Sequence, residues 1–272
     1  MWDISPFFVT ANKLNTTKDS PERYSASHIH DLCEIYVNLS GNVSFMVEKN
    51  VYTVKPRDIV ITKPYEYHHC IYNDDSDHLH YWILFSPNEN PTLFDFLLQK
   101  ERGTDNLIRL PEEISDRFLG LCERLVKANT EHRVLVLAVF YEILYHIAKG
   151  MTRYNIQEVN ETLPDGMKEI LNYINKNHAQ IKNVSELAET FRMSMATLER
   201  YFKKHVSLTP KQYLEDKKMA TACILLRQGY SVTDACFTSG FDDYSHFIAN
   251  FKKRFLTTPL KYKKNITKSL EM

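Results

Sequence analysis

Histidine is concentrated near the start of this chain of 272 residues, in a pattern suited to metal ligation or to hydrogen bonding with a polar molecule. Six of the eleven histidines lie between His28 and His80. Alternate side chains of an extended strand face the same side. The stretch HIHDLCEIYVN therefore predicts one polar face, made by His28, His30, Glu34, Tyr36 and Asn38.

The stretch HLHYWILF repeats this alternation with His78, His80 and Trp82. An interior lined by imidazole, carboxylate, phenol and indole groups suits an organic effector, because the polar groups bind hydroxyls and the rings stack on a sugar face. The residues expected to bind such an effector are His28, His30, Glu34, Tyr36, Asn38, His80 and Trp82.

Two stretches, HIHDLCEIYVNLSG and HCIYN, resemble the metal-binding motifs of the cupins, which are small β-barrels. The resemblance implies metal ligation by His28, His30, Glu34 and His69, and it adds His69 to the expected effector residues. Three imidazoles and one carboxylate suit an octahedral or open site. In PRDIVITKPYEYHH, however, Arg57 and Glu66 stand where cupins usually have glycine. Three interpretations stay open: an effector pocket, which we favour, a metal site in a sensor or enzyme, and histidines bonded to neighbouring strands.

The elements that must position these side chains are short strands, expected from about residue 25 to residue 86. In CEIYVNLSG, apolar and polar residues alternate with the period of two that is typical of a half-buried strand. Turn signals follow at Ser40-Gly41, at Lys55-Pro56 and around Asn73. Several short strands with such punctuation favour a barrel or a sandwich.

From about Leu93 to Met151 the apolar residues recur three and four positions apart, which predicts helices. The stretch from Val134 to Ala148 is apolar on more than one face, so we expect its own chain or a second subunit to cover it. That stretch is shorter than a bilayer span and carries Glu142 and His146.

Charge is distributed unevenly although the formal net charge is zero. Residues 1–164 hold 16 Lys and Arg against 23 Asp and Glu, whereas residues 165–272 hold 18 against 11. The basic second part is a candidate for binding a polyanion. The five cysteines form no C-x-x-C pair, which predicts reduced thiols. The chain starts without a basic segment followed by an apolar one, so we expect a cytoplasmic protein.

The basic part contains an internal repeat. Val184 pairs with Val232 at an offset of 48, whereas Phe202 pairs with Phe251 at an offset of 49, so one residue is inserted between them. Each copy predicts a short helix, a turn and a longer helix, which is a helix-turn-helix. The predicted turn and cap residues are Ser194 in the first copy, and Gly240 with Asp242 or Asp243 in the second.

The longer helix of each copy has an aromatic face and a face of small or polar side chains that ends in positive charge. Small polar groups let a helix approach base edges in the major groove, and Lys and Arg neutralise phosphates. The expected base-facing residues are Ala196, Thr197, Glu199, Arg200, Ser245, His246 and Ala249, with Arg200 as the best candidate for a guanine contact. The expected phosphate contacts are Lys203, Lys204, Lys252, Lys253 and Arg254.

These motifs resemble the AraC/XylS family of bacterial transcription regulators over about Lys168 to Lys264. The resemblance rests on VSELAETFRMSMATLERYFKKHVSLTP, on ACILLRQG and on DACFTSGFDDYSHFIANFKKRFLTTPLKYKK. It implies a DNA-binding domain of seven helices, attached to an effector or dimerisation domain. It also implies base reading by Ala196, Glu199, Arg200, Tyr244, Ser245 and Ala249, although the family often has arginine at the position of Ala249.

Together these features predict a multidomain α+β protein. Its expected parts are a cupin-like effector-binding barrel (1–92), a helical dimerisation segment (93–154), a linker (155–164) and an all-α DNA-binding domain with two helix-turn-helix motifs (165–272). The expected function is effector-responsive regulation at promoter DNA, as a homodimer that works with RNA polymerase and senses a small molecule such as a carbohydrate. No nucleophile–base–acid set or phosphate-cradling glycine loop is present, so we expect neither enzyme activity nor a cofactor nor a membrane partner.

Overall fold

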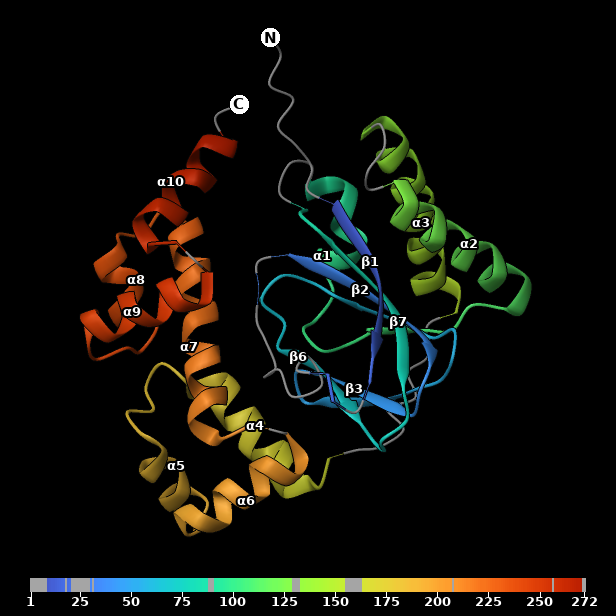
Figure 1. The fold of residues 1–272 in the computed structure, drawn as a ribbon. Coiled ribbons are helices and arrows are strands. Elements are labelled where there is room, and N and C mark those ends of the chain that lie inside the picture. Colours follow the sequence, from blue (N-terminus) through green and yellow to red (C-terminus); the bar gives the residue numbers. More distant parts are fainter. Residues whose placement is uncertain are drawn as a thin grey trace. The chain divides into compact units, whose positions relative to one another are not determined.

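The structure is a computed structural model that describes residues 9–17, 19–20, 30, 32–87, 91–128, 133–154, 163–206, 208–255 and 257–270. The chain divides into two compact units, Met1–Thr162 and Leu163–Met272. This division falls within the segment expected to be a linker, most of which lies outside the described residues. Strands occupy the first unit and helices the second (Figure 1), so the predicted α+β fold class is confirmed.

Two antiparallel sheets face each other in the first unit. One has the order β1-β7-β2-β5-β8 and the other the order β4-β3-β6. The strands are β1 (Val9–Thr16), β2 (Cys33–Ser40), β3 (Val43–Val47), β4 (Asn50–Val54), β5 (Ile59–Thr62), β6 (His68–Tyr72), β7 (His78–Phe85) and β8 (Leu107–Ile108). Strand β1 precedes the region in which strands were expected, and it pairs with β7 from Val9 to Thr16.

The alternation along β2 separates two cores, as the period of two predicts. Cys33, Ile35 and Val37 join a cluster that packs against helices. Tyr36 faces the other way and joins a cluster between the sheets with Phe45 of β3 and other residues. The polar face predicted for this strand therefore points into the space between the two sheets.

Two long helices, α2 (Glu112–Ala128) and α3 (Arg133–Arg153), follow the one-turn elements η2 (Pro91–Phe94) and α1 (Asp95–Leu98). Strand β8 interrupts this region, which was expected to be entirely helical, because Leu107 and Ile108 extend the five-stranded sheet beside β5. Helix α3 packs closely on that strand at Gly150, where an added Cβ would lie 2.7 Å from the Ile108 side chain. The two helices thus belong to the same unit as the sheets.

Helix α3 is long and apolar enough to cross a membrane by length and composition, so the expectation that it is too short was wrong. One face of the helix, including Phe140, Ile143 and Ile147, is buried in the core with Phe118 and Leu125 of α2. A core helix meets the same length and composition criteria as a membrane span. The packing of α3 on α2 and the sheet accounts for the apolar residues of its buried face.

The second unit contains seven helices within its described residues, as the family resemblance implied. They are α4 (Asp165–Asn177), α5 (Val184–Thr190), α6 (Met195–His205), α7 (Pro210–Arg227), α8 (Val232–Thr238), α9 (Tyr244–Phe255) and α10 (Pro259–Leu270). The pairs α5–α6 and α8–α9 are the two copies of the repeat, hereafter the first and second lobes. Helix α7 lies between them in the chain and contacts α6, α8 and α10.

Candidate nucleic-acid interface and effector site

In the first lobe, α6 begins at the predicted cap. The Ser194 side chain accepts a hydrogen bond from the Thr197 amide at 3.2 Å, which satisfies an amide that the helix leaves unpaired. Leu198 and Phe202 are fully buried and anchor the helix. Ala196, Glu199 and Arg200 are consequently exposed on the opposite face, whereas Thr197 is half-buried and its hydroxyl lies 2.8 Å from the Ser194 hydroxyl.

In the second lobe, α9 is capped by Asp243, one of the two predicted candidates, which accepts from the His246 amide at 2.9 Å. Phe247 and Phe251 are fully buried. Every residue expected to face bases on this helix is exposed, namely Tyr244, Ser245, His246 and Ala249. Tyr244, which the family resemblance implied as a base reader, is 41% exposed.

The turns of the two lobes have the same hydrogen bonds. The Met193 amide donates to the Ala188 carbonyl at 2.9 Å, and the Phe241 amide donates to the Cys236 carbonyl at 3.2 Å. This pair keeps the offset of 48, whereas the caps Ser194 and Asp243 are 49 apart. The inserted residue is therefore Asp242, which is exposed in the second turn.

Helix α7 fixes both lobes through buried polar groups. Lys218 is 6% exposed and donates to the carbonyl of Ile181 before α5 at 2.8 Å. Asp216 is 3% exposed and pairs with Arg254 at the end of α9. Burial raises the pKa of Asp216 to about 6, although Arg254 opposes that rise.

This ion pair changes the interpretation of Arg254, which was expected to contact phosphate. Its guanidinium donates a hydrogen bond to the buried Asp216 carboxylate, although the side chain is still 31% exposed. The other expected phosphate contacts, Lys203, Lys204, Lys252 and Lys253, are exposed at the ends of α6 and α9.

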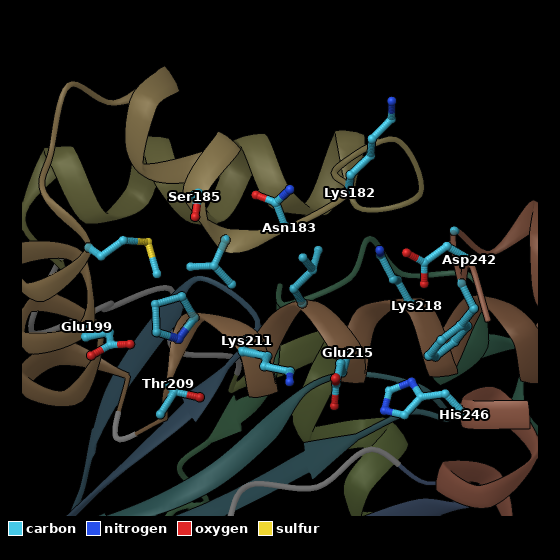
Figure 2. A pocket seen from close by; sticks show the side chains of 16 residues that line it. Lys182, Asn183, Ser185, Glu199, Thr209, Lys211, Glu215, Lys218, Asp242 and His246 are labelled. Atoms are coloured by element: carbon cyan, nitrogen blue, oxygen red, sulfur yellow. The ribbon is translucent and has the colours of Figure 1, made fainter.

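A hollow of about 580 Å³ lies between the lobes. Figure 2 shows Glu199 of α6 and His246 of α9 at opposite ends of it, with Lys211 and Glu215 of α7 along its floor. Each longer helix therefore contributes a polar side chain to the same hollow. Lys182 and Lys211 also line it and are exposed. Neither lies in a longer helix of the repeat, which is why a search of those helices missed them.

In the first unit, a cluster of rings lies between the sheets. Tyr36 and Trp82 are register partners on β2 and β7, and the Tyr36 hydroxyl bonds to the His78 imidazole. His78 and His80 are stacked with ring centroids 4.4 Å apart. Burial lowers the pKa of His80 to about 4, which keeps it neutral. Trp82 is half-buried, so part of its ring is accessible to a ligand.

A second group of side chains surrounds Glu34, which is 3% exposed. His30 Nε2 lies 3.2 Å from Glu34 Oε2, and His68 Nε2 lies 3.4 Å from the same oxygen. Burial lowers the pKa of His68, but the Glu34 carboxylate outweighs this effect, so the pKa lies above its ordinary value.

The implied ligand His69 does not belong to this group. In the register of β3 and β6, His68 is opposite Val47 and His69 is opposite Met46, so the two histidines project from opposite faces. The sequence offers no means of choosing between these neighbours, because both faces of β6 carry polar or aromatic residues. His28 lies outside the described residues.

Asn38, which was expected to bind effector, also links the two sheets. Its Nδ2 donates to the Val54 carbonyl at 3.3 Å across the two sheets. Its Oδ1 is buried and has no hydrogen-bond partner among the described residues. Thr62 Oγ1 is also buried without a hydrogen-bond partner among the described residues. Thr62 is the register partner of Glu34. Two unsatisfied polar atoms therefore lie near the polar face of β2.

Two family models match separate parts of the chain. An AraC-like ligand binding domain matches residues 16–144, and a helix-turn-helix domain matches residues 187–265. Together they cover most of the chain. The first match lies within the first unit of the structure, and the second match lies within the second unit.

Curated relatives are regulators. The HTH-type transcriptional activator RhaS of Enterobacter sp. (strain 638) is 23% identical over 92% of this chain and 92% of its own length. The uncharacterized HTH-type transcriptional regulator YdeC of Bacillus subtilis is 32% identical over 36% of this chain and 34% of its own length. Among solved structures, ToxT from Vibrio cholerae covers 95% of this chain and 99% of its own at 14% identity, with a TM-score of 0.39.

Proposed function

The chain belongs to the AraC family of transcription regulators, and from that premise we propose that α6 and α9 read base edges in promoter DNA. As a family member, the protein is an effector-responsive regulator that binds DNA through its helix-turn-helix domain. One observation carries the proposal: each helix buries an apolar face and exposes polar side chains, and Glu199 of α6 and His246 of α9 line the same hollow. Two such helices can enter successive major-groove segments about 34 Å apart.

The proposed contacts are exposed side chains, together with the half-buried Thr197. Base edges are contacted by Ala196, Thr197, Glu199 and Arg200 of α6 and by Tyr244, Ser245, His246 and Ala249 of α9. Phosphates are contacted by Lys203, Lys204, Lys252 and Lys253, and Lys182 and Lys211 add positive charge beside the hollow.

The experiment is selection of bound duplexes from a random pool by the full chain, followed by footprinting. We expect an enriched site whose protected bases fall in two segments about one helical turn apart. Equal affinity for enriched and random duplexes would contradict base reading, and a single protected segment would contradict the use of both lobes.

For the first unit we propose a pocket for a small polyhydroxylated effector, such as a sugar, between the two sheets. The stacked imidazoles of His78 and His80, the half-buried Trp82 and the unsatisfied Asn38 Oδ1 support this proposal. Indole rings stack on sugar faces, and an unsatisfied buried oxygen gains from a hydroxyl donor. His30, Glu34 and Tyr36 complete the polar lining.

The test is the thermal unfolding midpoint of the full chain against a panel of neutral sugars. A ligand that binds only the folded form raises the midpoint, by about 2.7 kcal/mol of stability at 100 times its Kd. Trp82→Ala should abolish the rise. Tyr81→Phe, on the opposite face of β7, should preserve it. A rise that survives Trp82→Ala would place the sugar elsewhere.

Dimerisation through α3 is part of the same proposal. Val134, Tyr141 and Tyr145 recur along one stripe of this helix and are 66%, 43% and 58% exposed. Burying such a stripe against a second copy would remove apolar surface from water. We propose a cytoplasmic homodimer that activates transcription with RNA polymerase and has no enzyme activity. Tyr145→Glu should convert the dimer to monomer in sedimentation experiments, and an unchanged mass would contradict this interface.

A further inference from the structure

The strongest unassigned feature of the first unit is the convergence of two imidazoles on a single carboxylate oxygen. The Nε2 atoms of His30 and His68 lie 3.2 Å and 3.4 Å from Glu34 Oε2. The ligand atoms of the three residues all lie within 4.8 Å of one another. Two ligands bound at 2.0–2.1 Å to one tetrahedral ion stand about 3.3 Å apart. The separations from Glu34 already have that size.

The other ring nitrogens determine what these Nε2 atoms offer. His30 Nδ1 lies 3.0 Å from the Leu32 carbonyl oxygen, and His68 Nδ1 lies 2.8 Å from the Glu66 carbonyl oxygen. A carbonyl only accepts, so each Nδ1 carries a proton, and each Nε2 toward Glu34 is the nitrogen that can bind a cation once it has lost any proton of its own. Either a proton on each Nε2 or one divalent cation can join these nitrogens to the carboxylate, and metal binding would displace the protons. Backbone carbonyls that hold Nδ1–H in this way are the usual outer partners of metal-bound histidine.

A further buried oxygen lies beside this group. Thr62 Oγ1 has no hydrogen-bond partner among the described residues, and Thr62 stands opposite Glu34 in the pairing of β5 with β2. Water bound to an ion at Glu34 would satisfy such an oxygen. The burial also differs along the site, because the His68 side chain is 1% exposed whereas that of His30 is 18% exposed. His30 therefore marks the side from which an ion enters.

We propose that His30, Glu34 and His68 bind one divalent transition-metal ion of the manganese-to-zinc series, with its remaining positions open to water or to an effector oxygen. Two imidazoles and a carboxylate select such ions over calcium and magnesium, which prefer oxygen ligands alone. The site extends the effector role proposed above, and it requires neither a sugar nor the DNA contacts.

The test uses the full chain, freed of metal by a chelator and titrated with Zn²⁺, Ni²⁺, Mn²⁺ and Co²⁺ in separate calorimetric experiments. We expect one ion per chain for at least one of these metals, and a visible Co²⁺ absorption spectrum typical of nitrogen and oxygen ligands. His30→Ala should weaken binding by at least tenfold, because it removes one of three ligands at the accessible edge.

Two variants separate the site from general effects of mutation. Glu34→Gln keeps the shape of the side chain and removes its charge, so metal binding should be lost. His69→Ala changes the neighbouring histidine on the opposite face of β6 and should bind metal as the unchanged chain does. No ion uptake by the unchanged chain, or equal loss in the His69 and His30 variants, would overturn the proposal. Retained DNA binding in either case would leave the regulator function standing.

Discussion

The two lobes of the DNA-binding unit share one local design and differ at the turn and on the exposed face of the longer helix. The first lobe turns at Arg192 with φ of 53°, and the second turns at the equivalent Gly240 with φ of 95°. Farther along the longer helix, Arg200 of the first lobe is matched at an offset of 49 by Ala249 of the second. The same secondary structure therefore supports two different contact surfaces.

The turn shows why equivalent positions tolerate different residues. Arg192 is exposed, so its side chain extends into solvent despite the left-handed backbone. A Cβ at Gly240 would lie 2.5 Å from the oxygen and 2.6 Å from the Cα of Ala179, in the turn after α4. Glycine is thus required in the second lobe by close packing as well as by its backbone angle.

The largest expected effect is that of Gly240→Ala. A left-handed alanine and a clash with backbone atoms should lower the free energy of unfolding by about 2–4 kcal/mol. Urea denaturation of the full chain measures it. Arg192→Ala is the matched control in the first lobe, where the change should stay below about 1 kcal/mol. Similar losses for the two variants would mean that Ala179 does not restrict the second turn.

The next effect concerns base reading and should be unequal between the lobes. Arg200→Ala should cost about 1–3 kcal/mol of DNA affinity at one base pair and relax the preference there, because it removes a bidentate donor. Ala249→Ser, at the equivalent position, should change affinity by less than about 0.5 kcal/mol. Competition binding with single-base variants of the selected site measures both. If Arg200→Ala weakens every sequence alike, the arginine contacts phosphate instead.

The smallest expected effect distinguishes the roles of two neighbouring cationic side chains in α9. Lys252 is exposed, whereas Arg254 is paired with Asp216. Lys252→Ala should reduce the slope of log K against log salt by about 0.9, the value for one phosphate contact. Arg254→Ala should leave that slope unchanged and lower the thermal midpoint, because Asp216 then stays buried without its partner. A lower slope for the Arg254 variant would restore its expected role as a phosphate contact.

Much of the DNA-binding unit was predictable because its signals are local. Ser194 caps a helix through its own amide neighbours, and Gly240 takes a positive φ because of its own backbone, so a short stretch suffices to predict both. The inserted residue could be counted from the repeat, but only the hydrogen bonds of the turns identified it as Asp242. The ion pair of Arg254 could not be predicted from a short stretch, because its partner Asp216 is 38 residues away.

The barrel also separates what the local sequence predicts from what depends on contacts between distant residues. The alternation of residues determined by itself that Glu34 and Tyr36 share one face of a strand, since side chains of a strand alternate whatever packs on it. Only the register between strands decided that His68 rather than His69 lies beside Glu34, because a shift of one residue turns every side chain of a strand to the other face. Long-range pairing sets that register, and no short stretch of sequence contains it.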